Sequence, residues 1–109
     1  MAEQHDRLVS AFTHRIARKG YTVLRHSPFV DYRPDVHAKK GGNQLFAEME
    51  IQATLHSEHT LQQLSTLHRY LANNRRCDGF LVVPHKVLPE ARMLLKSVFG
   101  DGSIRAEGM

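Results

Sequence analysis

The chain has 109 residues, 41% of them hydrophobic and 24% charged, and these values fit one globular domain over residues 1–109. Fifteen Lys and Arg residues against eleven Asp and Glu residues give a net charge of +4 with histidine neutral, which permits a polyanionic partner. The hydropathy pattern predicts no membrane span and no signal peptide. The single cysteine, Cys77, excludes a disulfide within the chain and indicates the reducing cytoplasm.

Residues 1–33 predict a helix, a strand and a loop in that order. Leu8, Phe12 and Ile16 recur every four residues, as on the buried face of a helix over about 3–19. Residues 21–24 are rich in β-formers and predict a short strand. The mixed polarity of residues 25–33 predicts a loop.

A β-hairpin is predicted around the Gly-Gly-Asn segment 41–43, because polar and apolar residues alternate on both sides of it. In the second strand the odd positions 45–51 are apolar, and the even positions 46–52 form the opposite face. This opposite face is not expected to belong to the core. We expect it to meet water or to bind a positively charged group.

The second half of the chain predicts a helix over about 60–75, from a stripe of leucines that begins at Leu61. An apolar strand buried on both faces follows at 79–84, and Pro89 lies in the first turn of a last helix over about 88–98. The tail 100–109 is expected to fray unless Ile104 adds an edge strand. The predicted order is αβββαβα, an α/β fold with a mixed central sheet flanked by helices and a core at about 3–98.

The hairpin register decides which acidic residues meet. If Gly41 and Gly42 form the turn, Asp35 lies directly across from Glu48. If the turn is Gly42 and Asn43 instead, Asp35 lies across from Glu50. Residues directly opposite each other have Cβ atoms about 5 Å apart, so either register crowds two carboxylates.

Crowded carboxylates repel each other unless a cation or a proton lies between them. Their oxygens are hard ligands that suit Mg²⁺ or Mn²⁺, bound together with water and a substrate phosphate. A metal held by Asp35, Glu48 and Glu50 can generate hydroxide and stabilise the transition state of phosphodiester cleavage. No small-molecule cofactor is indicated.

The segment RPDVHAKKGGNQLFAEMEIQ resembles the signature of the PD-(D/E)xK nuclease superfamily, which has the restriction-endonuclease-like fold. Pro34 and Asp35 correspond to the PD element, and a carboxylate about a dozen residues later corresponds to the second element. The preceding helix and KGYTVLRHS, and the helix and apolar strand that follow, agree with this likeness over residues 3–98. The archaeal Holliday-junction-resolvase branch is the most similar in appearance.

The lysine of that motif is absent, and two alignments remain open. In the first, Glu48-Met49-Glu50 is the motif and Glu50 takes the lysine position, as glutamate does in some restriction enzymes. In the second, Glu50-Ile51-Gln52 is the motif and Gln52 takes it. The resemblance implies that Asp35, Glu48, Glu50 and Gln52 form the catalytic set.

Supporting residues follow from the same resemblance. Gln62 or Gln63 is similar to a polar residue that points toward the site, Arg25 is similar to a phosphate-contacting position, and Glu3 or Asp6 is a further acid. The predicted DNA-binding cations are Arg25, Arg33, Lys39 and Lys40. Arg75 and Arg76 either cap a helix or contact DNA.

Other histidines and the cysteine are expected to have no catalytic role. His56 and His59 lack the spaced second pair that a zinc site needs, so they predict a surface loop. His37 is expected to be a pH-sensitive bystander on the acidic face, and Cys77 is expected to be a wholly or partly buried thiol.

We therefore expect a Mg²⁺- or Mn²⁺-dependent endonuclease that cleaves DNA, including branched or junction DNA, as a homodimer. The alternative is a catalytically inactive nuclease-fold module that binds nucleic acid or assists assembly. The missing lysine keeps this alternative open.

Overall fold

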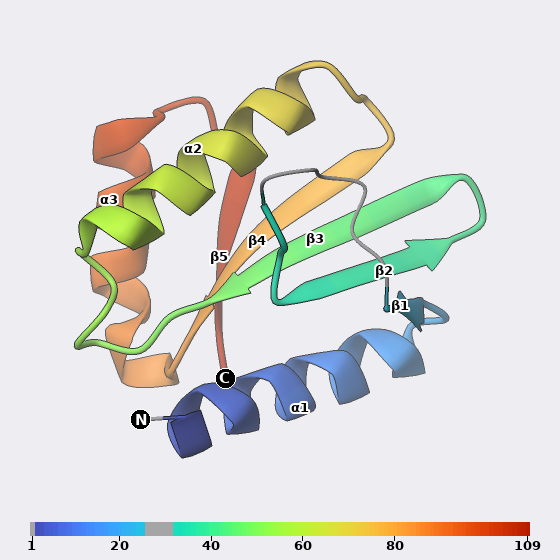
Figure 1. Ribbon diagram of the computed structural model, residues 1–109, viewed down its shortest axis with the longest axis horizontal. Coiled ribbons are helices and arrows are strands. Elements are labelled where there is room, and N and C mark those ends of the chain that lie inside the picture. The colour runs from blue at the N-terminus through green and yellow to red at the C-terminus, as the bar shows by residue number, and fades with distance from the viewer. Residues whose placement is uncertain (1, 26–31) are drawn as a thin grey trace.

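The computed structural model describes residues 2–25 and 32–109, in which a five-stranded sheet lies between helices (Figure 1). Residues 26–31 of the predicted loop lie outside the described part. The first half contains α1 (Ala2–Arg18), β1 (Thr22–Leu24), β2 (Val36–Lys40) and β3 (Asn43–Met49). The second half contains α2 (Glu58–Ala72), β4 (Cys77–Val83), the 3-10 helix η1 (His85–Val87), α3 (Leu88–Val98) and β5 (Ile104–Gly108).

The sheet is mixed, with strand order β1-β2-β3-β4-β5. β1, β2 and β3 pair antiparallel, whereas β3, β4 and β5 pair parallel. The α/β class, the mixed central sheet and the flanking helices are therefore as predicted. The tail does not fray: residues 104–108 form the edge strand β5, because Ile104 is buried against the core beside β4.

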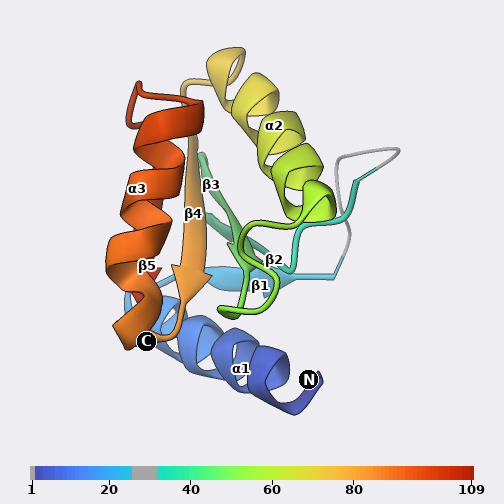
Figure 2. The ribbon, with the colours of Figure 1, turned by 90° about the vertical axis from the view of Figure 1, so that its left-hand side faces the viewer.

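Helices cover both faces of the sheet (Figure 2). Leu8, Phe12 and Ile16 of α1 pack on one face, against the apolar odd-numbered side of β3. The other face lies under α2 and α3, whose buried leucines belong to the same core cluster as Phe46. Among the described residues, none of the helices has the length and apolar character needed to cross a membrane.

The hairpin of β2 and β3 turns at Gly41 and Gly42, with Lys40 paired to Asn43 and Val36 paired to Ala47. Gly41 has a φ of 61°, which a residue with a side chain adopts only with strain. Continuing this register by one residue sets Asp35 directly across from Glu48, which is the first of the two predicted alternatives.

The even-numbered face of β3 was expected to lie outside the core, and this prediction was wrong. Phe46 and Glu48 both have 0% exposure, because α2 packs over that face. Of the acidic residues on this face, Glu48 lies inside the core. Glu50 follows the end of β3 at Met49, where the chain turns toward α2.

Candidate active site

Asp35 and Glu48 are held together by hydrogen bonds that cross between the two strands of the hairpin. The main-chain N–H of Asp35 donates to Glu48 Oε1 at 3.1 Å. In return Asp35 Oδ2 accepts the main-chain N–H of Met49 at 2.8 Å. Because each acid is held by the other strand, the positions of both carboxylates are set by the hairpin.

Glu48 is a buried acid with an unusual protonation behaviour. Burial raises the pKa of Glu48 to about 9, and the nearby charge of Asp35 acts in the same direction. Its second oxygen, Oε2, is buried, and the Tyr32 hydroxyl is a hydrogen-bonding neighbour of this carboxyl. Burial and the negative charge of Glu48 also raise the pKa of Tyr32, so the Tyr32 hydroxyl keeps its proton.

Glu50 lies one residue beyond β3 and is 8% exposed. Its main-chain N–H donates to Val82 O at 3.0 Å, which continues the β3–β4 pairing past the end of the strand. Burial raises the pKa of Glu50, and the hydroxyls of Thr54 and Thr60 oppose this by hydrogen bonding to the carboxylate.

A cavity of about 430 Å³ opens at this end of β3. Asp35 and Glu50 line it, together with His5 of α1 and His59 and Gln63 of α2. His5 Nε2 lies 3.2 Å from Asp35 Oδ2. The cavity therefore joins two carboxylates, two imidazoles and one amide that come from both faces of the sheet.

The two histidines were missed by the sequence reasoning. On α1 the sequence pointed to Glu3 and Asp6, and His59 was assigned to a surface loop. The inward residue of α1 is instead His5, and Glu3 pairs with Arg7 at 2.7 Å on the surface. His5 lies three residues before Leu8, so helical spacing places it beside the buried stripe of α1. This spacing is the sequence signal that could have identified His5 as an inward-facing residue.

The predicted glutamines divide between inside and outside the cavity. Gln63 lines it, whereas Gln62 is exposed and lines a neighbouring hollow with Tyr32 and Arg33. Gln52 was expected to share the strand face of the acids, but β3 ends at Met49 and Gln52 lies in the following turn. There its Nε2 donates to Glu90 Oε1 at 3.4 Å, so the structure does not bring it to the cavity.

The predicted DNA-binding cations are all exposed, but they do not form one cluster. Arg25 follows β1, and Arg33 lies beside the cavity region. Lys39 and Lys40 lie at the far end of β2, so that Lys40 is about 16 Å from Asp35 at about 3.3 Å per residue. Arg76 lies near them, since its Nη1 is 2.7 Å from the position of a Cβ on Gly42.

Three further residues have structural contacts. His37 is buried, stacks on Phe46 at 4.7 Å between ring centroids and has Nε2 2.7 Å from Gln44 Oε1. Cys77 is partly buried at the start of β4, and burial raises the pKa of its thiol. His56 lies 3.7 Å from Glu90, away from the cavity.

A metal site built only from protein groups is not found in the described residues, since no three His, Cys, Asp or Glu side chains converge to hold an ion there. The donor set still fits Mg²⁺, which protein sites hold through one or two carboxylates and otherwise through water and substrate phosphate. Glu48 Oε2 is buried near the Tyr32 hydroxyl, and a cation would give this oxygen a stronger partner. Asp35 and Glu50 line the cavity, and Glu48 is hydrogen-bonded to Asp35, so these three residues are the candidate ligands.

Comparison with known proteins gives no assignment: no family model matches the chain, and neither a curated protein nor a solved structure shows significant similarity to it.

Proposed function

We propose that this protein is a metal-dependent endonuclease of the restriction-endonuclease-like fold that hydrolyses phosphodiester bonds in DNA. The observation that carries the proposal is the hydrogen-bonded pair of Asp35 and Glu48, together with the cavity that Asp35 and Glu50 line. Burying Glu48 and Glu50 near Asp35 is costly unless a cation or a proton completes the site. Such an arrangement is common where phosphate chemistry needs a divalent cation.

Asp35 and Glu48 would hold Mg²⁺ or Mn²⁺, with Glu50 as a third candidate ligand. When bound, such a cation neutralises the charge that develops on the phosphodiester and lowers the pKa of the attacking water. Glu48 must lose its proton before it can bind the cation, because a protonated carboxyl is a poor ligand. Cation binding is therefore expected to strengthen as the pH rises.

Glu50 takes the lysine position of the motif in this proposal, because it lines the cavity and Gln52 does not. Its pKa is raised by burial, which brings it nearer to the range in which a carboxylate accepts a proton from water. Gln63 also lines the cavity and would orient the same water through its amide. His5 would keep Asp35 in position.

The basic end of the hairpin supports DNA as the polyanion. Lys39, Lys40 and Arg76 are exposed, and none of them forms an ion pair with a carboxylate in the part of the chain that the structure describes. They lie at the end of β2 opposite to the acidic cavity, so a DNA strand along the hairpin would meet cations at one end and the acids at the other. The proposal includes a homodimer in the reducing cytoplasm.

A second candidate is a nuclease-fold module that binds DNA without cleaving it. The observation that favours it is the composition of the cavity, which contains two histidines and a glutamine among its described lining residues but no lysine. In that case Glu48 would remain protonated, and its hydrogen bond with Asp35 would only stabilise the hairpin.

Cleavage assays on duplex, single-stranded and branched DNA, with Mg²⁺, Mn²⁺ or EDTA, separate the two candidates. The enzyme is expected to cut at least one substrate only with metal, and Asp35→Ala should lose that activity while still binding DNA. Glu3→Ala, which removes an exposed acid of α1 that pairs with Arg7 on the surface, is the matched control. Binding without cleavage on every substrate would favour the module.

A further inference from the structure

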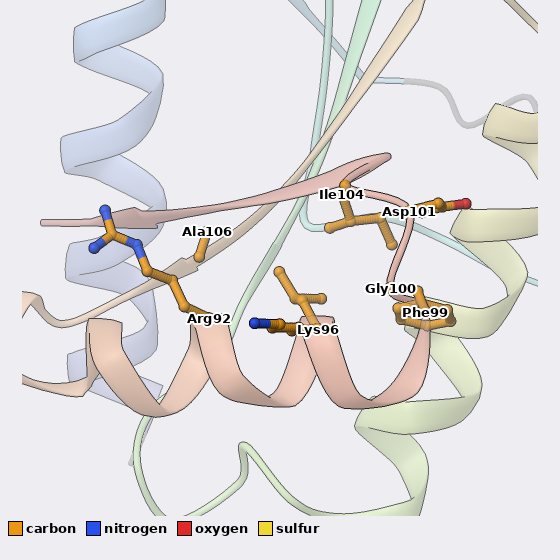
Figure 3. Close-up of a pocket in the computed structure, with 9 residues that line it drawn as sticks. Arg92, Lys96, Phe99, Gly100, Asp101, Ile104 and Ala106 are labelled. Carbon is orange, nitrogen blue, oxygen red and sulfur yellow. The ribbon is translucent and has the colours of Figure 1, made fainter.

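The edge strand β5 has a neighbour on one side only, because it ends the sheet order. A groove of about 320 Å³ runs along it, between the strand and α3 (Figure 3). Ile104 and Ala106 line the groove from the strand, and Arg92 and Lys96 line it from the helix. Strands with an open edge are places where another strand can add.

The direction of the β5 main chain shows which groups are available for such pairing. Met109 N–H donates to Val83 O at 2.9 Å, and Met109 O accepts from His85 N–H, so the polar groups of Met109 point toward β4. Direction alternates along a strand, so Arg105 and Glu107 also direct theirs toward β4. The main-chain N–H and C=O groups at positions 104, 106 and 108 therefore point to the open edge.

An antiparallel copy of β5 fits this edge in one register. With a two-fold axis at Ala106, each outward-pointing residue faces another one: Ala106 faces its own copy and Ile104 faces Gly108. In the same register Arg105 of each chain lies directly across from Glu107 of the other. These are the closely spaced pairs that make no main-chain hydrogen bonds, in which side chains interact most strongly.

Charged residues next to Arg105 and Glu107 would also complement each other across the two strands in this register. Within one chain Arg15 pairs with Glu107 at 3.0 Å, and Arg105 pairs with Asp78 at 3.2 Å. Pairing two chains would place these groups in a row of alternating sign, from Arg15 and Glu107 of one copy to Arg105 and Asp78 of the other. Charged residues on an edge strand usually discourage pairing, but here their order makes the strand complementary to itself.

We propose that β5 is the interface of a two-fold homodimer, in which the sheets of two copies join through antiparallel β5 strands around Ala106. This interface gives a location to the homodimer that belongs to the proposed function, but it does not depend on nuclease activity. A second copy is favoured over another partner because the complementary sequence is present in β5 itself. Arg92 opposes the association, since it lies beside Ala106 in the groove and faces its own copy across the axis.

Exchange of the two charges tests the register. Arg105→Glu and Glu107→Arg each set like charges opposite one another at both symmetric positions, and each should raise the dimer dissociation constant about tenfold or more. A mixture of the two single variants should form a heterodimer with nearly the wild-type constant. One variant then has two negative residues at 105 and 107 and the other has two positive ones, so both cross-strand pairs join opposite charges. Sedimentation equilibrium measures the constants, and native mass spectrometry identifies the heterodimer. Arg92→Gln should tighten the wild-type dimer.

A crosslink tests the same interface without changing a charge. In a Cys77→Ser background, Ala106→Cys should give a disulfide-linked dimer under mild oxidation, since facing residues lie about 5.5 Å apart between Cα atoms, within disulfide range. Ser97→Cys, an exposed position on α3, is the control and should crosslink far more slowly. A monomeric wild type at high concentration, a mixture that forms no heterodimer, or equal crosslinking at both positions would overturn the interface, whatever the result of the cleavage assays.

Discussion

Glu48 Oε1 accepts a hydrogen bond from the main-chain N–H of Asp35 at 3.1 Å, so the side chain of one acid is fastened to the backbone of the other. The reciprocal bond, from Met49 N–H to Asp35 Oδ2, closes the pair. Both acids are thus positioned by β-sheet geometry rather than by a flexible loop. Burial and the nearby charge of Asp35 make ionisation of Glu48 costly, so the fold should respond both to pH and to divalent cations.

The stability of the metal-free protein should fall as the pH rises. Glu48 has a pKa of about 9 in the fold and an ordinary value of 4.5, so the folded state holds a proton that the unfolded chain releases. The stabilising contribution is complete below about pH 4.5 and is lost progressively as the pH rises toward 9, at no more than about 1.4 kcal/mol per pH unit. Urea unfolding at pH 5 and pH 8 measures this difference.

Glu48→Gln mimics the protonated acid and should remove most of that pH dependence. At pH 8 the variant should be more stable than the wild type by up to about 5 kcal/mol. Glu90→Gln, at a half-exposed position, should leave the wild-type slope unchanged. Equal slopes in Glu48→Gln and wild type would show that Glu48 is ionised in the fold.

Mg²⁺ or Mn²⁺ should raise the melting temperature of the wild type, and more strongly at pH 8 than at pH 6, because the cation displaces the proton of Glu48. A concentration of about one hundred times the dissociation constant adds about 2.7 kcal/mol. Asp35→Asn should abolish the gain, whereas Glu3→Gln, at an exposed position of α1, should retain it. Calorimetry with millimolar metal checks this, and an unchanged melting temperature at both pH values would contradict a cation site.

Replacing Glu50 should separate the two alignments of the motif. Glu50→Gln is expected to lower the cleavage rate by about 10²–10⁴-fold, because the amide cannot accept a proton from the attacking water. Gln52→Ala should change the rate little, since Gln52 contacts Glu90 outside the cavity. Glu50→Lys should keep or gain activity if this position replaces the lysine of the motif. Single-turnover rates on the preferred substrate test all three, and loss of activity in Gln52→Ala alone would favour the other alignment.

DNA affinity should depend on salt through the basic end of the hairpin. Lys40→Ala and Arg76→Ala should each weaken binding on every DNA sequence and reduce the slope of log K against log salt by about 0.9 for each phosphate that the variant no longer neutralises. Arg7→Ala is the matched control, because Glu3 already neutralises Arg7. Fluorescence anisotropy from low to moderate salt measures the slopes. An unchanged slope in both variants would place the DNA elsewhere.

Local chemistry in the sequence was sufficient to predict the hairpin and the acid pair. Alternating side chains and two adjacent glycines restrict a two-residue turn to a small number of registers, and both registers considered brought Asp35 against a glutamate. The mixed α/β sheet could likewise be predicted, because helix and strand periods differ and the elements follow one another in a suitable order.

Only the tertiary structure decided what surrounds those acids. Whether a polar strand face meets water depends on which helix packs over it, and α2 buries Phe46 and Glu48 together. His5 and His59 are more than fifty residues apart in the chain, so no local pattern could bring them to one cavity. Gln52 leaves the site because β3 ends three residues earlier, and β5 forms because β4 offers it a free edge. Such outcomes arise from contacts distant in sequence, whose free energies depend on the whole packed fold, whereas the turn and the alternation are properties of neighbouring residues.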